Sequence, residues 1–125
     1  MLRMLSALLA LVWMATIFYL SSQPMPEINL GFSSQDKLLH LGAYGLLSML
    51  LLGGMPRRPD GYRLRQVLFA ALFAALYGCS DELHQSFVPS RQMDGLDLVA
   101  DALGALLGAL ALHALSQRIK PAPSL

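Results

Sequence analysis

Four long apolar stretches follow one another along this chain of 125 residues and limit what it can fold into. Each is about as long as a helix must be to cross the hydrocarbon core of a bilayer, at about 1.5 Å per residue. Prolines, glycines and charged residues separate them. The pattern predicts an all-α membrane protein, a single domain with a bundle of four transmembrane helices. The expected helices cover approximately residues 4–20, 37–55, 66–85 and 96–115.

The composition agrees with a chain that is surrounded by lipid. Hydrophobic residues make up 55% of it and charged residues 14%, whereas soluble domains contain roughly 25% charged residues. The net charge of +1 offers no concentrated basic surface, so we expect no nucleic-acid partner. A signal peptide is the alternative for the first stretch. The SSQP that follows it does not have small residues at both positions that signal peptidase reads, and the apolar run is longer than in a usual signal peptide, which favours a retained helix.

Basic residues are concentrated at one end of the expected bundle. Four spans place both termini on the same side as the arginine-rich loop 56–65, and basic residues mark the cytoplasmic side of membrane helices. That side carries seven of the nine basic residues: Arg3, Arg57, Arg58, Arg63, Arg65, Arg118 and Lys120. The other side carries Lys37 and Arg91. We therefore predict a multi-pass protein of the inner (cytoplasmic) membrane with both termini in the cytoplasm.

Polar side chains repeat every fourth residue on two of the expected helices. Asp36, His40, Tyr44 and Ser48 share one face of the second helix, and the third helix repeats the pattern through Asp81. Such a face should pack against protein rather than lipid. Ionisable groups within membrane helices are costly, so a set confined to one end indicates a functional site.

The ionisable residues of three expected helices meet at the end opposite the arginine-rich loop. Crowded carboxylates raise one another's pKa and a neighbouring cation lowers it, so an acid/base pair could arise there. Whether the chain is an enzyme stays open. The candidate catalytic residues are His40, Asp81, Glu82, Asp97 and Asp101. The candidates for ligand binding are Ser22, Gln23, Asp36, Lys37, Tyr44, Gln85 and Arg91.

Divalent metal binding is a second hypothesis for the same residues, although no spacing here matches a defined metal motif. The candidate ligands are Asp36, His40, Asp81 and Asp97.

Three functions are compatible with this arrangement. The first is binding or modification of a cell-envelope component, such as a lipid-linked precursor whose phosphate meets Lys37 and Arg91. The second is an accessory, small transport or assembly protein whose polar residues only pack the helices. In that case the GxxxG pair Gly104 and Gly108 would favour association with a partner helix. Proton or ion conduction ranks last, because the polar residues reach only about two turns into the membrane.

Three motifs taken together resemble the VanZ-like family. They are SSQ at residues 21–23, DKxxHxxxYxxL at residues 36–47 and DExxQxFxPxRxxDxxD at residues 81–97. The similarity covers nearly the whole chain, including the number and spacing of its apolar stretches. The resemblance implies a small bacterial membrane protein with about four helices, in a family whose namesake is associated with resistance to the glycopeptide teicoplanin.

The resemblance also marks individual positions. Those that match the family pattern are Ser22, Gln23, Asp36, Lys37, His40, Tyr44, Asp81, Glu82, Gln85, Arg91, Asp97 and Gly104. One departure is Asp101, which stands where the family often has asparagine. It adds a negative charge and makes a proton or cation role for this site more plausible.

Overall fold

Four α-helices make up the described part of the chain, residues 1–24 and 34–119, in this computed structural model. They are α1 (Leu2–Ser21), α2 (Gln35–Gly53), α3 (Leu64–Gln85) and α4 (Gly95–Arg118). Each lies over one of the predicted apolar stretches. The α4 helix continues three residues beyond the predicted end, to Arg118. Lys120, which was assigned to the basic end, lies outside the described residues.

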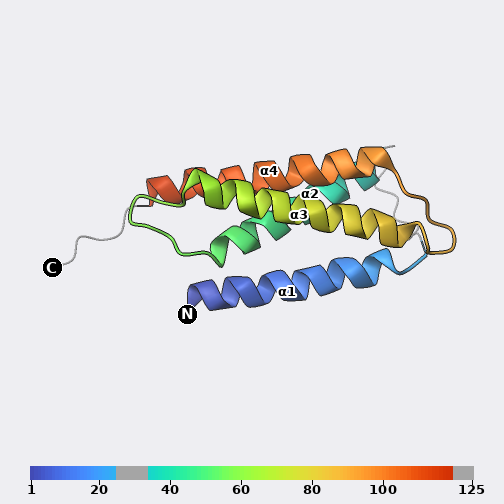
Figure 1. Cartoon of the computed structure of the whole chain (residues 1–125), viewed down its shortest axis with the longest axis horizontal. Coiled ribbons are helices and arrows are strands. Elements are labelled where there is room, and N and C mark those ends of the chain that lie inside the picture. The colour runs from blue at the N-terminus through green and yellow to red at the C-terminus, as the bar shows by residue number, and fades with distance from the viewer. Residues whose placement is uncertain (25–33, 120–125) are drawn as a thin grey trace.

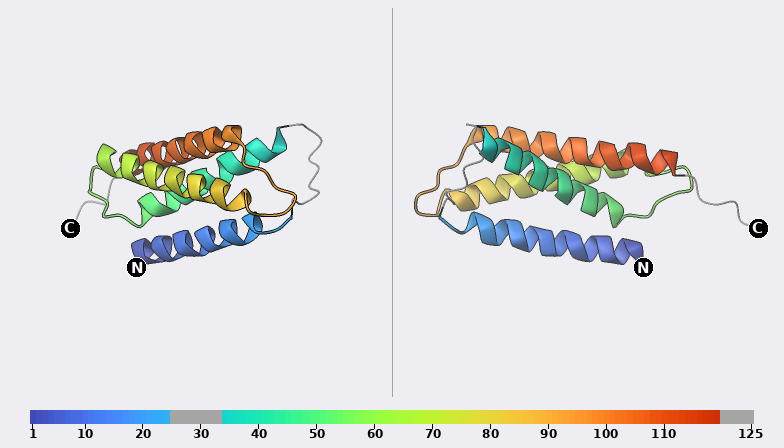
Figure 2. Two further views of the ribbon diagram at one scale, coloured as in Figure 1. Left: turned by 45° about the vertical axis from the view of Figure 1, so that its right-hand side comes forward. Right: turned by 180° about the vertical axis from the view of Figure 1, so that it is seen from behind.

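The helices run alternately in opposite directions (Figure 1). The start of α1, the loop between α2 and α3, and the end of α4 therefore lie at one end of the bundle. The end of α1, the start of α2, the end of α3 and the start of α4 lie at the other. The two further views show α2 crossing the bundle obliquely, from beside α4 at its start to beside α1 at its end (Figure 2).

Three of these helices are long and apolar enough to cross a membrane, judged by length and composition among the described residues: α1, α3 and α4. Large apolar side chains cover their outer surfaces, including Leu11, Leu72 and Leu107. The α2 helix has 19 residues, but polar residues occupy its first two turns and lower its hydropathy. The described part of the chain is thus all-helical, and its apolar helices indicate a multi-pass membrane protein.

Small residues bring α2 and α4 into close contact. Gly104 and Gly108 are buried on α4 against the backbone of α2. A Cβ atom at Gly104 would overlap the carbonyl of Leu41, and one at Gly108 would overlap the carbonyl of Gly45. Glycine permits this approach because it has no side chain, as is common between membrane helices. The GxxxG pair is therefore used for packing within the chain.

Hydrogen bonds from aromatic side chains attach α1 to the other helices. Trp13 Nε1 donates to the carbonyl of Ala43 on α2 (2.9 Å), and Tyr77 Oη on α3 donates to the carbonyl of Met14 (2.7 Å). A polar group in an apolar environment needs such a partner, so these bonds specify how α1 is rotated.

Candidate functional site

Lys37 lies near the start of α2 among three carboxylates. Its Nζ is 2.9 Å from Asp36 Oδ2, 2.7 Å from Asp94 Oδ2 and 2.6 Å from Asp97 Oδ1. These acids come from α2, the loop before α4, and the first turn of α4. The lysine therefore joins the beginnings of α2 and α4, which run in the same direction, and neutralises part of their negative charge.

Asp94 belongs to the motif at residues 81–97 but was not among the candidate site residues predicted from the sequence. It is the N-cap of α4, and its Oδ1 accepts the N–H of Leu96 (2.8 Å) while its own N–H donates to Glu82 Oε2 (3.1 Å). The hydrogen bond from Lys37 holds the pKa of the Asp94 carboxyl below its usual range. An aspartate directly before an apolar helix is an N-cap signature, and that signal could have identified it.

His40 lies one turn deeper than Asp36 and contacts acids from both α3 and α4. Its Nδ1 is hydrogen-bonded to Asp101 Oδ1 (2.8 Å) and lies 3.9 Å from Glu82 Oε1. Its Nε2 lies 3.6 Å from Asp97 Oδ2. The imidazole is thus placed between carboxylates on both sides, with 17% of its side chain exposed.

Two carboxylate oxygens at this level have no hydrogen-bond partner among the described residues. They are Glu82 Oε1 and Asp101 Oδ2, and both side chains are 0% exposed. Asp101 fits here because Gly78 of α3 leaves room, since a Cβ there would lie 2.8 Å from Asp101 Oδ2. A buried, unpaired polar atom is costly, so these two oxygens are the least satisfied groups of the site.

A third level lies one turn further into the bundle, where Tyr44 Oη donates to Asp81 Oδ2 (3.0 Å). Gln85 Nε2 also reaches Asp81 Oδ2, at 3.4 Å. All three side chains are buried. The polar faces predicted for α2 and α3 therefore do face each other. We call the aspartates, the glutamate, the lysine and the histidine of these three levels the polar cluster. Its members are Asp36, Lys37, His40, Asp81, Glu82, Asp94, Asp97 and Asp101.

The remaining predicted ligand-binding residues form a separate group at the end of α1. Ser22 Oγ is hydrogen-bonded to His84 Nε2 (2.8 Å). Arg91 Nε donates to the carbonyl of Gln23 (2.8 Å), and its Nη2 donates to that of Leu20 (3.2 Å). Arg91 thus attaches the α3–α4 loop to the last carbonyls of α1, where a cation is favoured.

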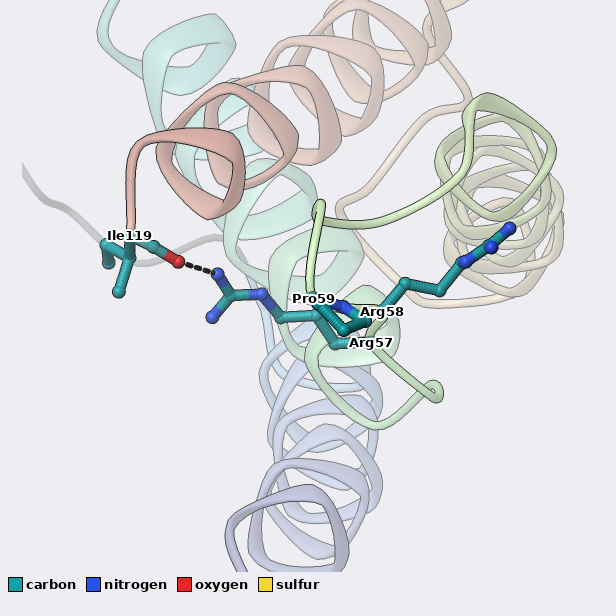
Figure 3. Close-up of a pocket in the computed structure, with 4 residues that line it drawn as sticks. All are labelled: Arg57, Arg58, Pro59 and Ile119. Carbon is teal, nitrogen blue, oxygen red and sulfur yellow. Dashed lines mark hydrogen bonds between the residues drawn. The ribbon is translucent and has the colours of Figure 1, made fainter. Parts of the chain in front are cut away.

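The opposite end of the molecule contains a hollow of about 310 Å³ lined by Arg57, Arg58, Pro59 and Ile119 (Figure 3). Arg57 donates hydrogen bonds to the carbonyls of Ser116 and Ile119, so its guanidinium closes the end of α4. The arginine-rich loop is therefore held against α4, far from the polar cluster.

The described residues include two sets of possible metal ligands. One consists of His40, Glu82 and Asp101, and the other of Asp36, Asp94 and Asp97. The second set surrounds the ammonium of Lys37, which already supplies a positive charge. Of the four predicted metal ligands, His40 belongs to the first set and Asp81 to neither.

Comparison with known proteins supports the resemblance seen in the motifs. No curated protein and no solved structure matches the chain. The family model described as VanZ/LLP1 matches residues 6–116, nearly the whole chain and all the residues of the polar cluster. The predicted family is therefore confirmed, and the chain belongs to the VanZ/LLP1 family of membrane proteins.

Proposed function

We propose that the protein binds or modifies a component of the bacterial cell envelope through the polar cluster. The observation that carries this proposal is the confinement of the cluster to one end of the bundle, with Glu82 and Asp101 fully buried and incompletely hydrogen-bonded. Polar residues that only join helices would be distributed along their length, and each would find a partner.

The charge of the cluster indicates which part of an envelope component it would contact. Six carboxylates face only two basic side chains, Lys37 and His40. This balance suits amines, sugar hydroxyl groups or cations better than a phosphate. In a lipid-linked precursor, the acyl chain would lie along the apolar helices and the sugar or amine portion would face the acids.

The distribution of basic residues supports an orientation for this site. With the arginine-rich end in the cytoplasm, α2 would also cross the membrane, which gives four spans in total. The polar cluster would then face the extracytoplasmic side of the inner membrane, where envelope precursors are assembled into the wall. Teicoplanin susceptibility is a useful readout, because the family's namesake is associated with resistance to this glycopeptide.

An accessory or small transport role is less well supported. The small-residue face formed by Gly104 and Gly108 is already covered by α2, so a partner helix would have to use another surface.

The proposal is tested by the thermal stability of the detergent-purified protein with added envelope lipids. The panel contains a polyprenyl phosphate, a polyprenyl-diphosphate sugar, phosphatidylglycerol and phosphatidylethanolamine. A ligand that binds only the folded state raises the melting temperature. We expect one lipid to stabilise the wild type and Asp60→Asn, a control at the opposite end, but not Asp81→Asn. If no lipid distinguishes Asp81→Asn from the control, the polar cluster is packing and the proposal fails.

A further inference from the structure

We infer that His40, Glu82 and Asp101 form a binding site for one divalent transition-metal ion, either Zn²⁺ or Mn²⁺. One ligand atom of each residue lies within 4.8 Å of the others. The set combines one residue from each of α2, α3 and α4, so a bound ion would join the three helices that make up the polar cluster. This inference concerns the site of the proposed function, but it is tested independently of any lipid.

Two incompletely bonded oxygens support this metal site. Glu82 Oε1 and Asp101 Oδ2 are buried and lack hydrogen-bond partners among the described residues. Glu82 Oε1 lies 3.9 Å from His40 Nδ1, on the side where Asp101 Oδ1 also approaches. Oxygens left in this way within a packed interior indicate a group that binds there and completes their coordination.

The charge of the three ligands favours a divalent ion. Two ionised carboxylates and a neutral imidazole carry a charge of −2, which a divalent ion cancels and a monovalent ion does not. Neutrality matters because both carboxylates are 0% exposed, in a medium where uncompensated charge is costly.

The environment of the histidine is also that of a metal ligand. The Nδ1 of His40 faces the two candidate ligands, and its Nε2 faces Asp97 Oδ2 at 3.6 Å. Metal-binding histidines commonly direct their second nitrogen to a carboxylate, which orients the ring and increases its basicity. Asp97 is itself held by Lys37 at 2.6 Å, so this positioning group is fixed in turn.

The neighbouring set of acids provides a contrast. Asp36, Asp94 and Asp97 are as close together, but Lys37 lies within 2.9 Å of an oxygen of each. The positive charge that balances these acids is therefore supplied by a side chain of the protein itself. The inner set has no lysine or arginine within salt-bridge distance among the described residues, so it is the set whose negative charge an added divalent cation would neutralise.

The donor atoms indicate which ions would bind. Metal–ligand bonds of about 2.0 to 2.2 Å place neighbouring ligand atoms about 3.0 to 3.5 Å apart. The distances from His40 Nδ1 to Asp101 Oδ1 (2.8 Å) and to Glu82 Oε1 (3.9 Å) lie on either side of this range. Imidazole favours Zn²⁺ and related ions, whereas Mg²⁺ and Ca²⁺ prefer oxygen ligands alone. We therefore expect Mn²⁺ and Zn²⁺ to bind more tightly than Mg²⁺ or Ca²⁺.

The test is a Mn²⁺ titration of the full-length, tag-free protein in detergent, followed by the electron paramagnetic resonance signal of free Mn²⁺. The wild type should bind one ion per chain, and Zn²⁺ should displace it. Glu82→Gln and Asp101→Asn keep the shape of the side chain and should weaken binding at least about tenfold. Two controls should bind as the wild type does: His113→Gln removes another histidine, and Asp60→Asn removes an acid from the opposite end.

A second measurement needs no variant of the ligands. Pulsed magnetic resonance of the Mn²⁺ complex should detect one directly bound imidazole nitrogen, and that signal should persist in His84→Gln and His113→Gln. The inference is overturned if the wild type binds no Mn²⁺ or Zn²⁺ at about 1 mM, if both carboxyl variants bind normally, or if no nitrogen is coordinated. Binding of Mn²⁺ without any response to the lipid panel would leave the metal site standing and reject the envelope proposal.

Discussion

The close contact between α2 and α4 makes Gly104→Ala a demanding test of the fold. The added methyl group would overlap the carbonyl oxygen of Leu41, which is backbone and cannot rotate away. The two helices must then separate. Leu41 follows His40 directly, and Gly104 lies one turn after Asp101, so the separation should also lengthen the 2.8 Å contact between His40 and Asp101.

The chain offers a matched control in Gly42, which lies on α2 near the same contact. A Cβ at this position meets no atom within 4 Å. Overpacking at Gly104 should destabilise by about 1 to 3 kcal/mol, whereas alanine at Gly42 should stabilise the helix by up to about 1 kcal/mol. We expect the two variants to differ by about 1 to 4 kcal/mol in the free energy of unfolding.

The assay is unfolding by sodium dodecyl sulfate from dodecyl maltoside micelles, followed by the fluorescence of the single tryptophan. Trp13 reports on the helix contacts because its indole donates to the carbonyl of Ala43 on α2. Equal stability of Gly104→Ala and Gly42→Ala would refute the packing described between α2 and α4.

Two further predictions concern the loop before α4 and the orientation of the bundle. The hydrogen bond from Lys37 lowers the pKa of Asp94 in the folded protein. The ionised carboxylate therefore stabilises the fold above its unfolded-state pKa of about 3.9, and this stabilisation is lost as the pH falls through the lower folded-state pKa. Asp94→Asn should therefore be less stable than the wild type at pH 6, with a difference that diminishes below about pH 4, as measured by the same unfolding assay. For orientation, single cysteines introduced as Asp60→Cys or Gln92→Cys in a Cys79→Ala background should react differently with a membrane-impermeant maleimide added to intact cells. Labelling at 92 and not at 60 is expected, and the reverse pattern would overturn the proposed orientation.

The sequence predicted the elements of this fold well because its signals are local. Four apolar stretches of helical length define the four helices, and the period-four spacing correctly placed His40 and Tyr44 on a protein-facing surface. Tyr44 is 1% exposed and bonded to Asp81 across the α2–α3 contact.

The site was predicted less completely because it depends on how the helices are rotated and how the loops run. Asp81 and Glu82 are neighbours in the chain, yet Asp81 bonds to α2 while Glu82 accepts the N–H of Asp94. Arg91 lies on the predicted side but contacts the end of α1, because the path of the α3–α4 loop directs it there. These pairings join positions 12 to 71 residues apart and require the tertiary structure.

The Glu82→Gln variant distinguishes a polar cluster that binds a ligand from one that only packs the helices. Gln retains an oxygen to accept the Asp94 N–H, but it removes a fully buried negative charge. Residues kept for function are often unfavourable for stability, so the variant should be at least as stable as the wild type in the presence of a chelator. Added Mn²⁺ should stabilise the wild type but not this variant. A loss of more than about 1 kcal/mol in chelator, with an unchanged response to Mn²⁺, would show that Glu82 holds the helices together and would contradict the account.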